Sequence, residues 1–278
     1  MQMYFPGLDS PVAFQGCDDI ADNIAAILCD WPTTRTDDAT TDPIITVRRD
    51  ADGYRCLSPW ADNDPLFPDP VDATCDLVAD LVQAFAHENG LLCLHAAAID
   101  FGGKLVVIPD TYRQGKSTLS STLAYRGMRL FSDDVLPIEK AGTRGMAMGI
   151  LPRVRLPLHD GADAGFRHLA ETDSVLKNHR YSYFGNCNTH VAPHGTLAPI
   201  AAIVMLDRKD ATCPELEPIK GSEALARLIE QNFAKAVPAP ETLDRLHEIV
   251  AGADCFVLHY GESGEAAPYL IEQLGKPA

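Results

Sequence analysis

The tetrapeptide at 115–118, Gly-Lys-Ser-Thr, follows an apolar run, Lys104–Ile108, and opens a segment with helical character, Lys116–Tyr125. A strand, a glycine-containing turn and a helix in this order form the setting in which backbone N–H groups at a helix N-terminus cradle phosphate oxygens. The sequence therefore predicts an α/β protein with a phosphate-binding P-loop. The alternative is an ordinary helix start with an exposed lysine.

In a P-loop, the lysine reaches the β- and γ-phosphates of a nucleotide and the following hydroxyl ligates Mg²⁺. These roles would fall to Lys116 and Ser117. The loop departs from the usual G-x-x-x-x-G-K-[S/T] pattern, because Asp110 stands where the first glycine is expected. A carboxylate near a triphosphate is unfavourable unless it is paired. Arg113 offers a pairing cation in the same loop and would also offset phosphate charge.

Two carboxylates, Asp133 and Asp134, follow the short apolar run Met128–Phe131. Carboxylates at the end of a strand are well placed to face a bound Mg²⁺, and one of a pair can accept a proton from an attacking hydroxyl. The alternative is a solvated turn, since aspartates are frequent in turns. His95 interrupts another apolar run, Leu91–Ile99, where a histidine is more often a satisfied core residue than a catalyst.

The rest of the chain predicts a mixed sheet rather than a purely parallel one, because a hairpin at 91–108 precedes the loop. Asp50–Gly53 predicts a second hairpin, between Ile44–Arg48 and Tyr54–Leu57. Further strands are predicted at Val135–Ile138, Ile200–Leu206 and Cys255–Tyr260, and further helices at Ile20–Trp31, Val71–His87, Ser222–Ala236, Pro240–Ala251 and Glu265–Leu274. Residues 1–89 are expected to form a small α+β region of unassigned role, and residues 90–278 a catalytic domain.

The formal net charge of −16 argues against a broad nucleic-acid or anionic-membrane surface. No apolar stretch approaches the ~20 residues of a spanning helix, and the N-terminus lacks the features of a signal peptide. The eight cysteines are scattered without a C-x-x-C pair, so we expect reduced thiols in a cytoplasmic protein. A zinc site at Cys187, His190 and His194 is an alternative that lacks a second close cysteine.

Residues 139–200 are expected to be rich in loops and carry several basic side chains. Arg153, Arg155, Lys177 and Arg180 are candidates to hold a phosphate or carboxylate of an acceptor. The alternative is that these side chains are simply solvated on a surface loop.

Taken together, the motifs resemble HPr kinase/phosphorylase-like proteins, and more closely the divergent HprK-related bacterial kinases. The resemblance rests on Leu94-His-Ala-Ala-Ala98, a glycine-rich turn, the tetrapeptide at 115–118, Arg126-Gly127 and Leu130-Phe-Ser-Asp-Asp134. It extends over about residues 90–275. Such proteins have a P-loop fold related to ATP-dependent phosphoenolpyruvate carboxykinase. A match to the C-terminal signature by which HPr kinases bind HPr is missing.

The resemblance implies transfer of a phosphoryl group from ATP to a hydroxyl of a peptide, protein or small molecule. Relatives of this type include kinases that modify a serine of a ribosomally made peptide. By match to the motif, ATP and Mg²⁺ would be held by Gly115, Lys116, Ser117 and Thr118. Asp133 and Asp134 would supply the catalytic base and a metal contact, the latter assigned to Asp133, and His95 would line the phosphate pocket.

Two readings of other classes remain beside the kinase. A catalytically degenerate nucleotide sensor or scaffold is motivated by Asp110. A peptide-binding accessory protein is motivated by the undeciphered region before Leu91. The sequence leaves open the acceptor, the oligomeric state, including a homo-oligomer, and whether phosphorolysis also runs.

Overall fold

The computed structural model describes residues 1–38, 41–61, 63–109, 114–158, 162–185, 190–209 and 213–275. Its helices are α1 (Asp18–Ile27), α2 (Pro70–Glu88), α3 (Lys116–Tyr125), α4 (Ala164–Thr172), α5 (Gly221–Gln231), α6 (Ala239–Ala251) and α7 (Ser263–Leu274). Its first strands are β1 (Gln2–Tyr4), β2 (Val12–Gln15), β3 (Thr34–Thr36), β4 (Ile45–Asp50), β5 (Gly53–Leu57), β6 (Leu66–Phe67), β7 (Leu92–Asp100) and β8 (Leu105–Pro109). The others are β9 (Arg129–Ser132), β10 (Val135–Ile138), β11 (Arg144–Met146), β12 (Arg153–Arg155), β13 (Ser174–Lys177), β14 (Tyr181–Phe184), β15 (Leu197–Arg208), β16 (Glu215–Pro218) and β17 (Asp254–Tyr260).

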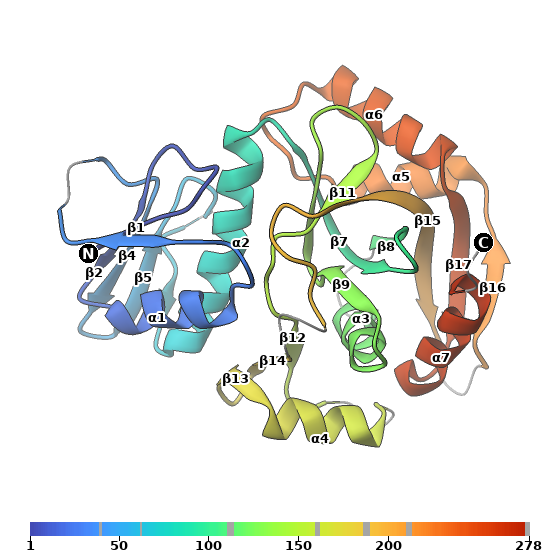
Figure 1. The fold of residues 1–278 in the computed structure, drawn as a ribbon, viewed down its shortest axis with the longest axis horizontal. Helices are drawn as coiled ribbons and strands as arrows, with labels where there is room; N and C mark the ends of the chain where they lie inside the picture. The colour runs from blue at the N-terminus through green and yellow to red at the C-terminus, as the bar shows by residue number, and fades with distance from the viewer. Residues whose placement is uncertain are drawn as a thin grey trace.

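The N-terminal region is a six-stranded sheet in the order β3-β1-β2-β4-β5-β6, packed with α1 and α2 (Figure 1). The β4–β5 hairpin predicted around Asp50–Gly53 is confirmed, with Asp50 opposite Gly53. Helix α2 begins where the Asp69 carboxylate accepts hydrogen bonds from the backbone N–H groups of Val71 and Asp72. This cap satisfies donors that the first helical turn leaves unpaired.

The larger sheet has eight strands, with the path β11-β10-β7-β8-β15-β17-β16 and β9 paired to β7. Strands β8, β15 and β17 run parallel to one another, whereas the β7–β8 hairpin and the remaining pairs are antiparallel. Strand β11 pairs with both β10 and β15, so this part of the sheet closes on itself. The prediction of a mixed α/β sheet is confirmed.

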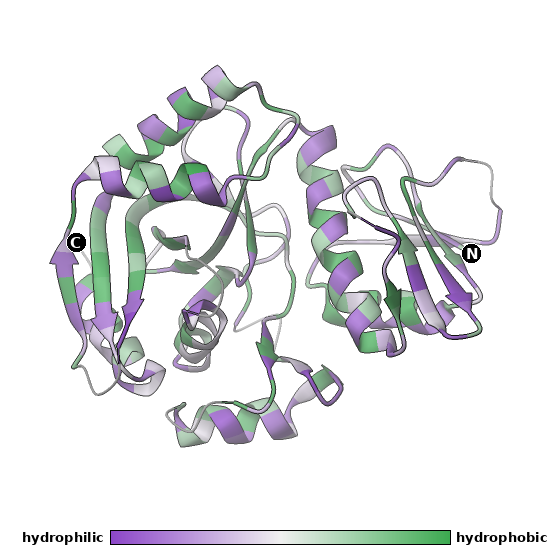
Figure 2. Ribbon diagram, turned by 180° about the vertical axis from the view of Figure 1, so that it is seen from behind, coloured by the Kyte–Doolittle hydropathy of each residue, from purple (hydrophilic) through white to green (hydrophobic). Residues whose placement is uncertain are grey.

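Both faces of the larger sheet are covered by helices, and its strands are strongly apolar (Figure 2). On one face, α5 and α6 contribute Leu228 and Leu246 to a buried cluster. On the other face, α3 and α7 contribute Leu119 and Leu270 to a second cluster. The central strands β7 and β8 are buried along almost their whole length, and near-continuous apolar runs are expected for strands that are covered on both faces, as the sequence has them.

The alternation of side chains along β7 determines on which face of the larger sheet the His95 side chain lies. Leu94 and Ala96 belong to the cluster beneath α5 and α6, whereas Ala97 and Ile99 belong to the cluster beneath α3. Since side chains two apart in a strand point to the same face, His95 lies on the α3 side. The polar residue in an apolar strand is thereby directed toward the start of α3.

Helix α2 stands between the small and the large sheet (Figure 1). The buried cluster around it includes Ile24 and Leu77 of the N-terminal region and also Leu91, Cys93 and Met148. One apolar core therefore crosses the boundary predicted near residue 89.

Three predictions of local structure were wrong in detail. Residues 139–200 contain β11 to β14 and α4 among their loops, because strands of three or four residues show too little periodicity to be read from sequence. Helix α5 ends at Gln231 rather than Ala236, since Asn232 is extended. Helix α1 ends at Ile27 rather than Trp31, since Leu28 is extended.

The expectation of reduced thiols was wrong for Cys29, which is disulfide-bonded. The absence of a C-x-x-C motif argues only against a bond between neighbouring cysteines. The free cysteines of the described chain are Cys17, Cys56, Cys75, Cys93, Cys213 and Cys255. No helix within the described ranges has the length and hydropathy to cross a membrane.

Asp76 of α2 provides a test of how this helix is buried between the two sheets. Its Oδ2 is buried without a hydrogen-bond partner among the described residues, and burial, with Asp80 one turn away, raises its pKa to about 6. A raised carboxyl pKa stabilises the folded state at low pH, and this stabilisation is lost as pH rises through about 6. Asp76→Asn should therefore raise the free energy of unfolding at about pH 7.5 by on the order of 1–3 kcal/mol, and by much less at about pH 4.

Urea unfolding at the two pH values measures this effect. Asp244→Asn, at an exposed position of α6, is the matched control and should change stability little at either pH. An equal effect of Asp76→Asn at both pH values would contradict the burial of an ionised carboxylate.

Candidate functional site

Helix α3 begins at Lys116, directly after Gly115, and β8 ends at Pro109. Gly115 has φ +90°, a left-handed conformation that favours glycine. The Tyr260 hydroxyl donates to the Gln114 carbonyl oxygen at 2.7 Å, which ties the residues before the helix to the end of β17. Asp110 and Arg113 lie outside the described residues, so the conformation of the loop stays a prediction.

Asp133 and Asp134 lie between β9 and β10, two strands that follow one another in the chain and both pair with β7. Strand β9 pairs Ser132 with Ala98, and β10 resumes with Val135 opposite His95. In the interval, the Ser132 hydroxyl donates to the Ala96 carbonyl oxygen at 3.0 Å and accepts from the Asp134 N–H at 3.2 Å. The hydroxyl takes the place of ladder hydrogen bonds, and the two aspartates stand at the break.

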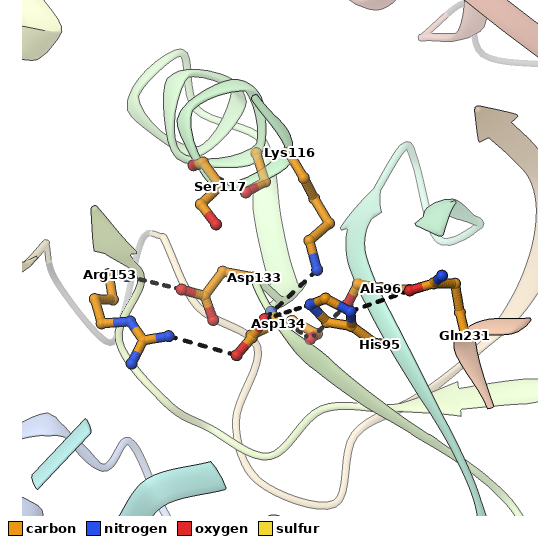
Figure 3. Close-up of polar contacts among 10 residues, drawn as sticks. His95, Ala96, Lys116, Ser117, Asp133, Asp134, Arg153 and Gln231 are labelled. Carbon is orange, nitrogen blue, oxygen red and sulfur yellow. Dashed lines mark hydrogen bonds and ion pairs between the residues drawn. The ribbon is translucent and has the colours of Figure 1, made fainter. Parts of the chain in front are cut away.

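The Asp134 carboxylate is the point at which side chains from three elements meet (Figure 3). Its Oδ1 lies 3.0 Å from His95 Nε2 and 3.5 Å from Lys116 Nζ. Its Oδ2 lies 3.4 Å from a terminal nitrogen of Arg153. The structure thus brings together four of the residues that the sequence singled out, from β7, α3, the β9–β10 junction and β12.

The surroundings of Asp134 keep it ionised. Burial acts to raise its pKa, but the hydrogen bond from His95 and the charges of Lys116 and Arg153 outweigh burial and hold the pKa well below its usual range. Opposite charges at such distances favour the charged form of a carboxyl group. Asp134 is therefore a permanent anion and a poor proton acceptor.

Asp133 has the opposite character. Burial, and then the negative charge of Asp134, raise its pKa to about 6. Its Oδ2 accepts the backbone N–H of Arg153 at 2.8 Å, which holds the carboxyl group in place. Two adjacent carboxyl groups thus differ in acidity, as pairs that divide acid–base and electrostatic roles do.

The sequence analysis missed Gln231, near the end of α5. Its Oε1 lies 3.1 Å from His95 Nδ1. A side-chain amide carries both a donor and an acceptor, so Gln231 is able to partner Nδ1 in either protonation state of the ring. Nothing in the sequence distinguishes this glutamine from other polar residues of α5, because its role depends on α5 packing beside β7.

Other predicted residues are placed elsewhere. Arg180 pairs with Asp72 of α2 at 3.0 Å. Arg155 is exposed on β12, and Lys177 is exposed on β13. Thr118 lies in the first turn of α3. Of the candidate acceptor-binding residues, the structure brings only Arg153 to the aspartate pair.

A divalent cation is compatible with the oxygen donors at hand. The Ser117 side chain lies on the side of α3 that faces Asp133 (Figure 3), and hydroxyl and carboxylate oxygens are hard ligands that suit Mg²⁺. Within the described ranges, no group of three or more His, Cys, Asp or Glu side chains is arranged to hold a metal ion by itself. Protein ligands would thus be few, as is usual where nucleotide phosphates complete the shell of Mg²⁺.

Two pockets adjoin the aspartates. The first is lined by Asp133, Asp134 and Arg153 together with apolar residues of α2, and its empty volume of about 450 Å³ includes the open solvent at its mouth. The second is lined by His95, Asp134 and Gln231, and its empty volume of about 680 Å³ likewise includes open solvent. Asp134 lines both pockets, together with Ala79 and Val135, so groups bound in the two pockets would approach the same carboxylate.

Comparisons with known proteins leave the family open. No protein-family model matches the chain, and no curated protein matches its sequence. Among solved structures, the HPr(Ser) kinase/phosphatase from Coxiella burnetii aligns at 15% identity with a TM-score of 0.31, over 66% of this chain and 92% of that chain. This distant structural likeness assigns neither a family nor an activity, and the resemblance to HprK-related kinases stays a prediction.

Gly115 gives a test of the geometry before α3. A Cβ at Gly115 would lie 2.5 Å from the Tyr260 hydroxyl oxygen, whereas a Cβ at Gly127, with φ +91°, would meet nothing within 4 Å. Both alanine variants carry the strain of a left-handed residue, about 1–3 kcal/mol. Gly115→Ala should cost more than Gly127→Ala in urea unfolding, because only the former adds a collision.

Tyr260→Phe removes the oxygen that collides. The cost of Gly115→Ala should therefore be smaller in the Tyr260→Phe background than in the unmodified protein, a coupling that a double-mutant cycle measures. Equal costs at the two glycines, or no coupling to Tyr260, would contradict the close approach of β17 to the start of α3.

Proposed function

We propose that the protein is an ATP- and Mg²⁺-dependent phosphotransferase that transfers the γ-phosphoryl group of ATP to a hydroxyl acceptor. The observation that carries the proposal is the arrangement around Asp134. A lysine at the N-terminus of a helix, a histidine and an arginine converge on one permanently ionised carboxylate, and a second carboxyl group with a pKa of about 6 stands beside it.

Each part of this arrangement suits phosphoryl transfer. The N-terminus of α3 and Lys116 would hold the β- and γ-phosphates, since backbone N–H groups and a nearby cation stabilise phosphate charge. Asp134 would keep Lys116, His95 and Arg153 in position, because it contacts all three. Catalysis of this kind depends mainly on positioning and electrostatic stabilisation.

The reaction proceeds by exchange of one phosphorus–oxygen bond for another. The acceptor oxygen bonds to the γ-phosphorus as the bond to the β–γ bridging oxygen breaks, and ADP leaves with the electron pair. The acceptor proton passes to the Asp133 carboxylate. A base with a pKa near 6 is largely ionised at neutral pH and still accepts a proton readily.

Ser117 and Asp133 would supply the protein's oxygen ligands to Mg²⁺, which neutralises charge on the phosphates when bound. The proton-accepting role and the metal-binding role of Asp133 predict different effects of Asp133→Asn on ATP binding. Asp133→Asn should reduce turnover by at least about 10²-fold. If Asp133 acts as the base, the variant should keep the affinity for ATP that calorimetry measures with Mg²⁺ present. If Asp133 is instead a ligand of Mg²⁺, the affinity of the variant for ATP should no longer depend on Mg²⁺.

Lys116→Ala tests the nucleotide site. Loss of the lysine charge should abolish transfer of label from γ-labelled ATP to acceptor or water and weaken Mg²⁺-dependent ATP binding. Lys104→Ala, in the exposed turn before β8, is the matched control and should leave both unchanged. If the unmodified protein binds ATP without transfer or hydrolysis, the nucleotide-sensor hypothesis would be favoured. If it does not bind ATP, both the kinase and the sensor hypotheses would be contradicted.

The pH dependence of turnover tests the division of roles between the aspartates. Asp133 becomes protonated as pH falls through about 6. Where Asp133 acts as the base and does not ligate Mg²⁺, kcat/KM should therefore fall on the acid side with an apparent pKa near that value, because a bound cation would lower the pKa of a carboxylate that ligates it. Asp134→Asn removes a negative charge that raises the pKa of Asp133, and in its residual activity this acid limb should move to lower pH. An acid limb that is absent, or that does not move, would contradict the assignment of Asp133 as the base.

A further inference from the structure

The first pocket, called here the α2 pocket, has walls of two kinds. Asp133 and Arg153 lie at its polar end, and Val78, Ala79, Val135 and Ile150 form an apolar wall. These four apolar residues each retain part of their surface, whereas Met148 behind them is 2% exposed. Val78 and Ile150 line this pocket and not the second one, whereas Ala79 and Val135 line both.

The wall comes from both parts of the chain. Val78 and Ala79 belong to α2, Val135 opens β10 directly after the aspartates, and Ile150 follows β11. Asp133 lines this pocket but not the one that contains His95 and Gln231. A hydroxyl that gives its proton to Asp133 is thus best accommodated in the α2 pocket.

The charges of the α2 pocket restrict what else the acceptor carries. Arg153 is the cation of its lining, and its guanidinium is paired with Asp134 and lies over the Tyr181 ring at 5.1 Å. The lining also holds the two aspartates and two further ionisable groups, Cys75 and Tyr183, and burial raises the pKa of both, which keeps them uncharged. An acceptor with a negative charge near its hydroxyl would meet carboxylates without an uncommitted cation in the lining, which is unfavourable in a partly buried site.

We infer that the acceptor is an uncharged alcohol whose hydrocarbon chain lies against the α2 wall. This inference rests on the proposed function for the reaction but not for the binding site. The hydroxyl oxygen bonds to the γ-phosphorus of ATP, its proton goes to Asp133, and ADP departs with the electrons of the broken bond. The product is a phosphate monoester, and its apolar chain remains against α2.

The binding site is tested without ATP by protein-observed NMR. The six methionines are labelled with ¹³C in their methyl groups, and the Met148 signal is assigned from Met148→Leu. Ethanol, n-propanol, n-butanol and n-pentanol are titrated as probes. Each added methylene that leaves water should tighten binding by about fourfold, which corresponds to about 0.8 kcal/mol.

Val78→Asp places a charge in the wall at a residue that is already partly exposed, and Val78→Thr changes polarity with little change of shape. Both should weaken n-pentanol binding, the former by at least about tenfold, with ATP binding unchanged. Val175→Asp, at a valine on β13 that is 43% exposed, is the matched control and should leave alcohol binding unchanged.

Shifts at Met148 that grow with chain length and are lost in Val78→Asp support the inference. Affinities independent of chain length, or equal in Val78→Asp and Val175→Asp, overturn it. Transfer of labelled phosphate to n-pentanol is measured separately. Binding with the expected pattern but without transfer would leave the alcohol site standing and count against the phosphotransferase. Transfer to serine peptides or sugars in preference to n-pentanol would overturn the alcohol as acceptor while the phosphotransferase stands.

Discussion

The Asp134 carboxylate connects His95, Lys116 and Arg153, which come from a strand of the larger sheet, a helix N-terminus and the edge strand β12 of a separate three-stranded sheet. A half-buried anion is costly unless it is paired and hydrogen-bonded. Its position therefore requires all three partners, and each of those side chains in turn depends on the sheet and helices that hold it. The low pKa of Asp134 and the raised pKa of its neighbour both follow from this one arrangement.

The interruption between β9 and β10 allows these contacts to form. A continuous strand would point successive side chains to opposite faces of the sheet and pair its backbone with β7 throughout. Instead, Ser132 takes over hydrogen bonds that the ladder would make, and the carboxylates of Asp133 and Asp134 both contact Arg153. Local irregularity next to a polar cluster is a common way in which sheets direct side chains toward a site.

Helix α2 places the N-terminal region beside the candidate site, which the sequence of this region does not predict. It shares a core with residues of the larger domain and lines both pockets next to the aspartates. Its acidic face also receives Arg180, which pairs with Asp72. In this structure, the region before residue 90 is part of the surroundings of the aspartate pair.

The sequence by itself determined the elements with long, regular patterns. The bounds of α3 and β10 were predicted to the residue, and the two hairpins and the mixed character of the larger sheet were also predictable, because apolar periodicity and turn residues act locally. The candidate site was predictable as far as its chemistry-bearing residues, namely His95, Lys116, Asp133, Asp134 and Arg153. What only the tertiary structure decided was their contacts: the partner of His95 on α5, the opposite acidities of two adjacent aspartates, the pairing of Arg180 with α2 and the bonded state of Cys29. These depend on distances between residues far apart in the chain and on burial, neither of which local sequence patterns contain.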